Sequence, residues 1–303
     1  MYDIANYEEA HTVEEAICLL KANPNAHLIA GGSDLLIKIH EGKFSDIELI
    51  GIRDIPELKN ISLEDDGTIT IGSGATFSQI AHHPIIRENI PVLGEAVDKV
   101  GGPQIRNIGT IGGNICNGVT SADSASTLFA LNCLLRIKGA NGRRMVAIEN
   151  FYQGPGQVDL SHDEVLTAII IAPENYQGFG GHYIKFVMRN AMDIATLGCV
   201  VLCKLDGREV IADFRLAFGV AAPTPIRCRE TEEMVRGKIF SSDLLQEVGR
   251  WAAGEVNPRN SWRASKEYRL NLVEELSKRA FEQAFSNALK KPTRRLNKFS
   301  TRN

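Results

Sequence analysis

The 303-residue chain contains 44% hydrophobic and 23% charged residues, a balance typical of globular proteins that excludes extended disorder and fibrous structure. Its net charge of -3 provides no general attraction for nucleic acid or for an anionic membrane. Because single hydrophobic cores stop growing near ~250 residues, the length predicts two or three domains.

The N-terminal residues indicate the cellular compartment, and the cysteines indicate whether a metal centre is expected. The chain shows no basic segment followed by an apolar one at its start and no run of ~18 apolar residues, so we expect a cytoplasmic protein without membrane contact. The six cysteines form no Cys-x-x-Cys pair and no four-cysteine spacing, so no metal centre is expected. Cys199 and Cys203 are interpreted as reduced core thiols, whereas Cys116 could either pack or contact a ligand.

Helix and strand signals alternate in the first third of the chain. Residues 12–20 predict a helix, because Thr12 stands at the N-cap and Glu15 follows three residues later, as in a capping box. Residues 61–72 predict a hairpin that turns at Asp66-Gly67. Strands are also expected at 27–30 and 47–52, and helices at 35–40, 76–81 and 91–100.

The turn Gly31-Gly32-Ser33-Asp34 connects the strand at 27–30 to the helix at 35–40. The free N-H groups at the start of that helix could hold a phosphate, with Ser33 assisting. Asp34 could cap the helix or accept hydrogen bonds from ligand hydroxyls. A plain strand-to-helix turn is an equal alternative if this segment is considered alone.

A glycine-rich run from 101 to 118 dominates the sequence. Glycine permits backbone conformations that bring successive N-H groups close to a ligand, so we predict an irregular anion-binding loop at Gly109, Gly112 and Gly113. Polar side chains that suit a phosphate accompany these glycines, namely Arg106, Asn107, Thr110 and Asn114. The alternative is a structural double turn.

The segment after the glycine run continues with a helix to about residue 132. Asp123 in this helix could bind a ligand or cap the helix, and its position slightly favours the cap. A hairpin at 134–148 is expected to turn at Asn141-Gly142, followed by a strand at 164–171 and a linker at 173–181.

The last third begins with a strand at 183–186. Its single charged residue, Lys185, is assigned to an exposed face by default. A hairpin at 197–220 is expected to turn at Asp206-Gly207, and helices are expected at 243–253 and 265–289. The basic tail from 290 to 303 contains no acidic residue and is interpreted as a solvated end rather than a docking arm.

The chain lacks the usual catalytic motifs. It has no Gly-x-Ser-x-Gly elbow, no His-Glu-x-x-His helix and no phosphate-loop signature, and Gly72-Ser73-Gly74 lacks the rest of a dinucleotide fingerprint. Phosphate-holding loops without a nucleophile or general base suit a protein whose cofactor supplies the chemistry. FAD fits this pattern, because its pyrophosphate and its two ends need separate loops.

Several motifs resemble a known family. Ala30-Gly31-Gly32-Ser33-Asp34 and residues 104–114 resemble the two FAD-binding loops in the flavoprotein subunits of molybdenum hydroxylases. Four longer runs, at 112–118, 188–194, 216–227 and 261–267, are similar to the FAD-binding subunits of bacterial xanthine dehydrogenases. The likeness extends to about residue 289.

This resemblance implies an α+β fold. Residues 1–176 would form a two-subdomain FAD-binding domain of the vanillyl-alcohol-oxidase (PCMH) type, with subdomains at about 1–57 and 58–176. Residues 177–290 would form an α+β C-terminal domain of the CO-dehydrogenase flavoprotein type, followed by a basic tail at 291–303.

The resemblance also implies the cofactor contacts and replaces the cap at Asp123 and the exposed face of Lys185 by contacts to FAD. In fused-chain relatives the loop after this lysine is more acidic, whereas Met192 stands here where an acid is expected and Asp193 remains. No catalytic residue and no metal ligand is expected. The implied FAD-binding residues are Leu28, Ile29, Ala30, Gly31, Gly32, Ser33, Asp34, Leu35, Gly109, Thr110, Ile111, Gly112, Gly113, Asn114, Asp123, Leu166 and Lys185.

The implied function is that of an electron-transfer subunit of a heterotrimeric oxidoreductase. A separate chain with molybdopterin would hydroxylate a purine, a separate 2Fe-2S chain would relay the electrons, and FAD on this chain would pass them to NAD. The alternatives are a flavin subunit for another substrate, such as carbon monoxide, nicotinate or an aromatic CoA thioester, and a stand-alone flavin oxidase. A non-catalytic nucleotide-binding module is the third hypothesis.

Overall fold

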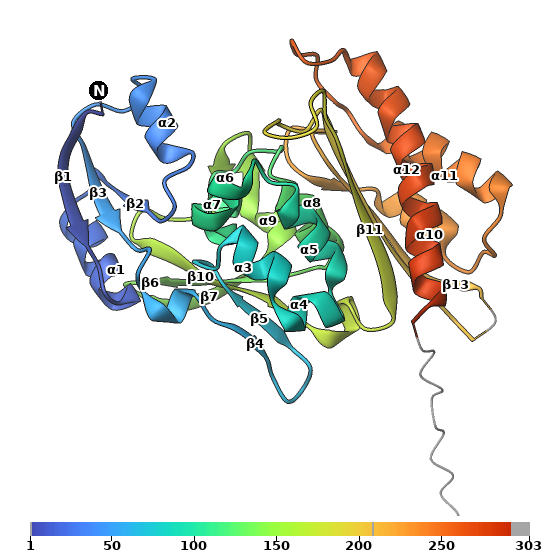
Figure 1. The fold of residues 1–303 in the computed structure, drawn as a ribbon, viewed down its shortest axis with the longest axis horizontal. Coiled ribbons are helices and arrows are strands. Elements are labelled where there is room, and N and C mark those ends of the chain that lie inside the picture. Colours follow the sequence, from blue (N-terminus) through green and yellow to red (C-terminus); the bar gives the residue numbers. More distant parts are fainter. Residues whose placement is uncertain (1, 208, 292–303) are drawn as a thin grey trace, which may run out of the picture.

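The computed structural model describes residues 2–207 and 209–291, which form three parts in sequence order (Figure 1). The first part contains a parallel three-stranded sheet in the order β1-β3-β2. Helix α1 packs against this sheet because its apolar residues, spaced by three and four, lie on one buried face. Its elements are β1 (Ile4–Glu9), α1 (Val13–Ala22), β2 (Ala26–Ile29), α2 (Leu35–His40) and β3 (Ile47–Gly51).

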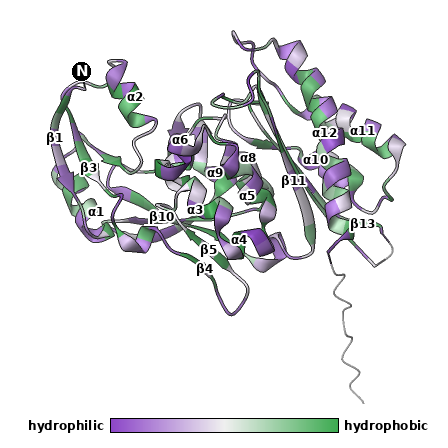
Figure 2. Ribbon diagram, viewed as in Figure 1, coloured by the Kyte–Doolittle hydropathy of each residue, from purple (hydrophilic) through white to green (hydrophobic). Residues whose placement is uncertain are grey.

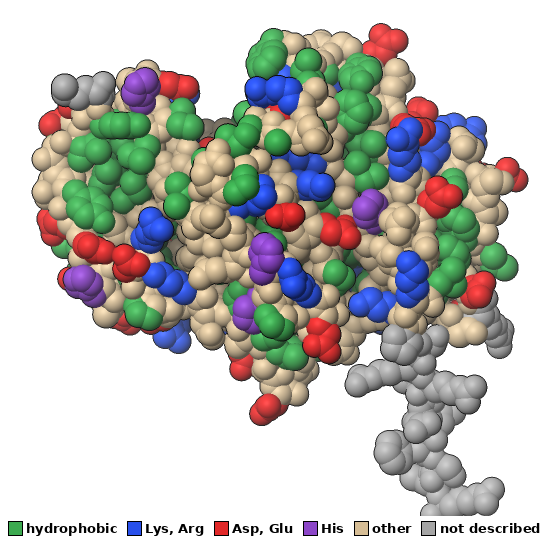
Figure 3. Space-filling model, viewed as in Figure 1, with side chains coloured by type: hydrophobic (Ala, Val, Ile, Leu, Met, Phe, Trp, Pro, Cys, Tyr) green, Lys and Arg blue, Asp and Glu red, His purple; other side chains and the backbone are tan. Residues whose placement is uncertain are grey.

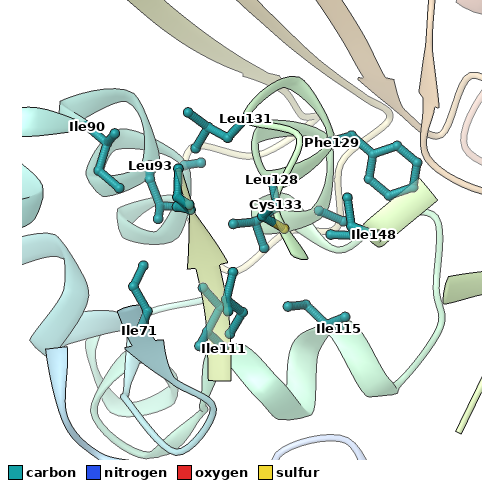
Figure 4. Packing of buried hydrophobic residues seen from close by; sticks show 14 of the residues in the cluster. Ile71, Ile90, Leu93, Ile111, Ile115, Leu128, Phe129, Leu131, Cys133 and Ile148 are labelled. Carbon is teal, nitrogen blue, oxygen red and sulfur yellow. The ribbon is translucent and has the colours of Figure 1, made fainter. Parts of the chain in front are cut away.

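The second part contains an antiparallel sheet in the order β4-β5-β10-β6-β7. Its strands are β4 (Ile61–Leu63), β5 (Ile69–Gly72), β6 (Leu134–Gly139), β7 (Gly142–Ala147) and β10 (Glu164–Ile171). Ile169 lies opposite both Ile71 and Leu135, so these three buried side chains form one row in the core. Figure 4 shows side chains such as Ile111, Ile115 and Leu128 packed in this core.

Short helices cover the core side of this sheet. They are α3 (Phe77–His82), α4 (Pro84–Asn89), α5 (Pro91–Asp98), α6 (Pro103–Ile108), α7 (Ile111–Cys116), α8 (Asp123–Ala130) and α9 (Ile148–Phe151), and a small ribbon of β8 (Tyr152–Gly154) and β9 (Gln157–Val158) follows. Two single-turn 3-10 helices, at Pro56–Leu58 and Pro173–Asn175, connect the parts.

The third part is an antiparallel sheet in the order β11-β12-β13-β14 with helices on one face. Strand β12 is buried on both faces: Val200 and Leu202 join the core of the second part, whereas Cys199 and Cys203 join a core with the helices. Figure 2 shows hydrophobic and hydrophilic residues alternating along α12, as expected for a helix that packs with one face. The elements are β11 (Phe179–Phe186), β12 (Leu197–Leu205), β13 (Ile211–Gly219), β14 (Ile226–Arg227), α10 (Arg229–Val235), α11 (Ser242–Glu255) and α12 (Lys266–Leu289).

Two buried arginines join the third part to the second. Arg215 donates hydrogen bonds to the carbonyl of Ala130 at 2.9 Å and to the Asn175 side chain at 3.1 Å. Arg227 forms a buried ion pair with Glu232 at 2.6 Å and also bonds the side chain of Asn132. Buried charged groups are stable only when they have such partners. These contacts therefore hold the second and third parts in a fixed relative position.

Most of the predicted elements are confirmed. Thr12 caps α1 by accepting a hydrogen bond from the Glu15 N-H, and β4 and β5 form the predicted hairpin. Strand β10 and helix α2 have the predicted bounds. The α+β fold class is also confirmed. These elements combine a strong local signal with a tertiary position that favours the same conformation.

Three predictions at element boundaries are wrong. The linker at 173–181 is shorter than predicted, because β11 begins at Phe179, which is buried in the core. The β6-β7 hairpin turns at residues 140–141, since Gly139 pairs with Gly142. The helix predicted to begin within 119–126 and to run to about residue 132 spans Asp123–Ala130. Residues 292–303 of the predicted tail lie outside the described residues.

Candidate functional site

A cavity of about 720 Å³ lies between the three parts of the molecule. Figure 3 shows the surface hollowed between the first part, at the left, and the rest of the molecule. The walls come from residues 26–38 of the first part, from several segments between 100 and 164, and from Lys185 and residues 192–194. A volume of this size accommodates a ligand as large as a dinucleotide.

The loop after β2 forms one wall of the cavity. Gly32 has a φ of +71°, a conformation that favours glycine. In the part of the chain that the structure describes, no group accepts a hydrogen bond from the backbone N-H of Gly31, Gly32, Ser33 or Asp34. All four residues line the cavity, and Asp34 makes no capping hydrogen bond to its own helix. Adjacent unpaired N-H groups beside a cavity are suited to an anion such as a phosphate.

The two predicted glycine motifs touch each other. A β-carbon at Gly31 would stand 2.0 Å from the carbonyl oxygen of Ile108, which immediately precedes Gly109. A second contact crosses between the same segments, where the ammonium of Lys38 donates to the Asn117 side chain at 2.6 Å. The first motif therefore lies directly beside the second, and residues of both motifs line the cavity, as a ligand that both motifs bind would require.

The prediction of an irregular loop at 101–118 is wrong, because most of this run forms α6 and α7. Gly112 packs against the β5 end, where an added β-carbon would stand 2.6 Å from the Ser73 β-carbon. The N-H groups of Gly112 and Gly113 bond within the protein, to the Ser73 carbonyl and the Thr110 hydroxyl. This motif can therefore contact a ligand through its side chains, but not through the N-H groups of Gly112 and Gly113.

The side chains of the second motif remain close to the cavity. Asn114 accepts a hydrogen bond from the Ser124 hydroxyl at 2.7 Å through its oxygen, which leaves its amide N-H groups for another acceptor. Thr110 and Gly113 also line the cavity. Arg106 does not, because it bonds the Val100 carbonyl and pairs with Asp98.

Asp123 and Lys185 form an ion pair at 2.8 Å on the cavity wall, and only 6% of the lysine side chain is exposed. Lys185 also donates to the carbonyl of Lys99 at 2.9 Å, and the buried Tyr183 hydroxyl donates to Asp123 at 2.9 Å. Burial raises the pKa of Asp123, while Lys185 and Tyr183 oppose this by stabilising the carboxylate.

The cap predicted for Asp123 and the exposed face predicted for Lys185 are both wrong. Ala122 occupies the N-cap of α8, and Asp123 is the first residue inside the helix. Lys185 points from β11 towards α8, because Asp123 offers a buried lysine the counter-charge that it needs. The contact of Tyr183 with Asp123 was not predicted. The only signal for it in the sequence is that Tyr183 lies two residues before Lys185, on the same face of the strand.

Of the residues that the resemblance assigned to FAD, 13 line the cavity. They are Leu28, Ile29, Ala30, Gly31, Gly32, Ser33, Asp34, Leu35, Thr110, Gly113, Asn114, Asp123 and Lys185. Gly109, Ile111, Gly112 and Leu166 do not line it. Leu166 and Ile111 are buried in the core of the second part.

Several lining residues were not predicted as contacts. Phe77, Val100 and Ile105 provide apolar surface. Cys116, which the sequence left open as either a packing residue or a ligand contact, also lines the cavity. At the end near β2, His162 lies close to the carbonyls of Leu20 and Asn23. These residues come from segments far apart in the sequence, so no local pattern identifies them.

Glu164 lines the cavity from the start of β10 and is held by Arg144. Two hydrogen bonds, at 2.7 and 2.8 Å, join their side chains, and Arg144 also bonds Asp159 at 2.7 Å. These hydrogen bonds hold the pKa of Glu164 below its usual range. The pair fixes the position of β7 relative to β10 beside the cavity.

The loop after Lys185 lines the cavity with residues 192–194. Met192 lines the cavity with a φ of 56°, and its N-H bonds the Gly101 carbonyl. Asp193 accepts hydrogen bonds from the N-H groups of Met188, Arg189 and Ile194. The acid that remains in this loop therefore organises its backbone.

The described residues contain no group of three or more His, Cys, Asp or Glu side chains arranged to hold a metal ion. None of the helices among the described residues is long and apolar enough to span a membrane. All six cysteines are free.

The chain matches two family models. Residues 3–174 match the FAD binding domain in molybdopterin dehydrogenase, and residues 182–284 match the CO dehydrogenase flavoprotein C-terminal domain. The cavity agrees with the first match, because unpaired N-H groups, amide donors and a buried cation surround a space suited to a dinucleotide.

Related proteins are similar in sequence to almost the entire chain. The putative xanthine dehydrogenase FAD-binding subunit XdhB of Escherichia coli is 43% identical over 95% of this chain and 98% of its own length. The carbon monoxide dehydrogenase medium chain of Hydrogenophaga pseudoflava is 32% identical over 92% of this chain and 96% of its own. A solved carbon monoxide dehydrogenase from Hydrogenophaga pseudoflava superimposes with a TM-score of 0.90 at 30% identity, covering 95% of this chain and 99% of that one. The chain therefore belongs to the FAD-binding subunits of the molybdenum hydroxylases, and within them to the xanthine dehydrogenase type.

Proposed function

We propose that this chain is the electron-transfer subunit of a cytoplasmic, multi-subunit xanthine dehydrogenase that uses NAD as its acceptor. It would receive electrons from a 2Fe-2S chain, while a molybdenum chain oxidises the purine. The observation that carries the proposal is the single cavity lined by residues 31–34, whose N-H groups are unpaired, by Asn114 and by the Asp123–Lys185 pair. When bound, FAD supplies the one- and two-electron redox chemistry that no side chain of this chain provides.

The protein groups would divide the ligand between two ends. The N-H groups of residues 31–34 and the Asn114 amide would donate to the pyrophosphate oxygens. The ammonium of Lys185 has three N-H groups, and Asp123 and the Lys99 carbonyl use two of them, so the third is available to the ring system. We call the end of the cavity at Asp123 and Lys185 the flavin end. Phe77, Val100 and Ile105 would exclude water from the ring.

The remaining assigned residues would act indirectly. Gly109 and Gly112 would allow the close packing that places Thr110 and Asn114 at the cavity, and Ile111 and Leu166 would support that wall from the core. We therefore propose direct FAD contact for the lining residues and a supporting role for these four.

An anaerobic titration of the isolated chain with NADH tests the proposal. The purified protein should carry about one flavin per chain, and NADH should bleach its absorbance. A colourless protein that takes up no added FAD would contradict the FAD site, while a flavoprotein that NADH leaves oxidised would contradict the NAD acceptor.

The substrate of the complex is tested separately. Carbon monoxide dehydrogenase medium chains have the same fold at lower identity, so the fold alone does not select a purine. Co-purification with the iron-sulfur and molybdenum chains, followed by assays with xanthine, carbon monoxide and nicotinate, distinguishes these substrates. Oxidation of xanthine with NAD reduction is the expected result.

A further inference from the structure

We propose that Thr120 is a positioning residue for the flavin, although its own side chain does not line the cavity. The inference rests on the proposed function, because it concerns the geometry of the flavin end. Residues 119–122, which we call the entry segment, lie between α7 and α8. This segment lines the cavity except at Thr120, whose side chain bonds to the third part of the molecule instead.

The side chain of Thr120 is bonded to the turn that follows β13. Its hydroxyl donates to the carbonyl of Ala222 at 3.1 Å and accepts a hydrogen bond from the Val220 N-H at 3.1 Å. The same N-H also donates to the Thr120 carbonyl at 3.2 Å. Within the part of the chain that the structure describes, no other hydrogen bond joins the entry segment to the third part.

The backbone of this turn is strained. Val220 has a φ of 68°, a left-handed conformation that is an outlier for a β-branched residue. Such a conformation persists only where the surrounding structure imposes it, and residues of this kind cluster at functional sites. Here the bonds to Thr120 and the burial of the neighbouring Ala221 impose it. The strain therefore indicates that the contact between the turn and the entry segment matters for function.

The chain around the start of α8 is attached to the third part at both ends of one row of its sheet. Lys185 of β11 lies opposite Gly198 of β12, which in turn lies opposite Gly219 of β13. At one end of this row, Lys185 pairs with Asp123. At the other end, a β-carbon added to Gly219 would stand 2.9 Å from the Thr120 carbonyl oxygen. The sheet therefore supports the entry segment and Asp123 at two points.

The attachment at Thr120 helps to fix the distance between the charged groups at the flavin end. Lys185 is held by its strand and by its bond to the Lys99 carbonyl, whereas Asp123 follows the entry segment directly, in the first turn of α8. Loss of the bonds at Thr120 should let Asp123 move relative to Lys185. A weaker ion pair leaves more of the ammonium charge to act on a ring bound beside it.

The attachment also places a free hydroxyl on the cavity wall. Ser121 follows Thr120 directly and lines the cavity. No hydrogen bond joins its side chain to another of the described residues. A hydroxyl can donate one hydrogen bond and accept others, so Ser121 is available to a ligand. Movement of the entry segment would displace this group together with Asp123.

The test compares Thr120→Val with the parent, as full chains loaded with FAD. Valine keeps the approximate shape of the side chain and removes both hydroxyl hydrogen bonds. The Kd for FAD should rise about threefold to tenfold, as the loss of a hydrogen bond typically causes. Reduction makes the ring more negative, and Asp123 would neutralise Lys185 less completely. The midpoint potential should therefore rise by about 14–30 mV, which is the same factor converted for a two-electron couple.

Two variants distinguish positioning from a purely structural role. Thr120→Ser keeps the hydroxyl and should show the Kd and the midpoint potential of the parent. Thr167→Val is the matched control, because the Thr167 hydroxyl donates to the Arg136 carbonyl at 2.9 Å and does not line the cavity. This control should unfold at a lower urea concentration, but its flavin should keep the Kd and the potential of the parent.

Gly219→Ala displaces the entry segment by a different route. The added β-carbon would meet the Thr120 carbonyl, so the Kd and the potential should both rise, as in Thr120→Val. Gly94→Ala is its control, because the nearest atom to the added β-carbon would stand 3.8 Å away. Should Thr120→Val fail to fold, Gly219→Ala decides the question.

The outcomes separate the inference from the proposed function. An unchanged Kd with an unchanged or lower potential in Thr120→Val overturns the inference, as does a Thr120→Ser variant that behaves like the valine variant. Equal changes of the flavin in the control variants also overturn it. A parent chain that takes up no FAD contradicts the proposed function itself, and the inference then fails with it.

Discussion

Gly31 lies against the backbone of Ile108 so closely that a β-carbon on the glycine would stand 2.0 Å from the isoleucine carbonyl oxygen. This contact sets the distance between the two motifs beside the cavity. Gly31→Ala must therefore push them apart, and we expect purified protein to retain less than about a tenth of the normal flavin, as backbone displacements at a binding site typically cause. Flavin absorbance per chain measures this.

The control for this substitution is Gly254→Ala. Gly254 lies in α11 with open space around an added β-carbon, and alanine favours helix more than glycine does. This variant should keep its flavin, and its melting temperature should stay the same or rise slightly. Normal flavin content in Gly31→Ala would show that the Gly31–Ile108 contact does not determine binding.

Tyr183→Phe removes one of the two side-chain hydrogen bonds to the buried Asp123 carboxylate. The unsatisfied acceptor should lower the free energy of unfolding by about 1–3 kcal/mol. Because Asp123 then relies on Lys185 alone, we also expect a shift in the flavin absorption maximum and weaker FAD binding. Urea unfolding and a spectral titration measure the two effects.

Tyr176→Phe provides the comparison. The Tyr176 hydroxyl donates to the Gly67 carbonyl in the β4-β5 hairpin, away from the cavity. This variant should lose stability without a spectral change. If both variants leave the flavin spectrum unaltered, Tyr183 has a purely structural role.

Arg227→Ala leaves the carboxylate of Glu232 buried without its main partner. Loss of one member of a buried ion pair costs about 3–5 kcal/mol, so the variant should unfold at much lower urea concentration. Arg279→Ala removes an exposed pair with Glu275 on α12 and should cost less than about 1 kcal/mol. Similar losses in the two variants would contradict the importance of burial.

Acid should destabilise the protein partly through Glu164, whose pKa is lowered by its hydrogen bonds to Arg144. Because the pKa of Glu164 is lower in the folded protein than its ordinary value of 4.5, the ionised carboxylate stabilises the fold at pH values above that ordinary pKa. This contribution is lost as the pH falls through the pKa of the folded protein. Glu164→Gln should cost about 1.5–3 kcal/mol at pH 7, as hydrogen bonds between charged groups typically contribute.

The variant should also lose less stability than the parent when the pH falls from neutral into the acid range. Urea unfolding at several pH values measures both effects. An equal loss of stability with falling pH in the two proteins would show that Glu164 does not titrate in this way.

The sequence predicted elements whose signals are local. Thr12 caps α1, and β10 is a run of apolar β-branched residues that stays extended because it is buried in the middle of a sheet. The glycine run at 101–118 shows where local reasoning fails. Its glycines permit a loop, but Gly112 is needed because α7 packs directly on Ser73, a contact visible only in the folded chain.

The same distinction applies to the candidate site. Physical reasoning alone placed Lys185 on an exposed face, because the counter-charge at Asp123 lies 62 residues earlier in the sequence. The resemblance to a family selected both residues, and the structure brings them together on the cavity wall. The resemblance could not indicate Tyr183 or Arg269. Their hydrogen bonds, to Asp123 and to the carbonyl of Thr196, join residues that only the tertiary structure brings together.

Cys116 stands on the wall of the cavity that we propose holds a redox cofactor. Burial raises the pKa of its thiol to about 12. Since the thiolate is the form that oxidants attack, a raised pKa makes this thiol less reactive at neutral pH than an exposed one. Its burial therefore favours the reduced form of a cysteine that stands beside a redox site.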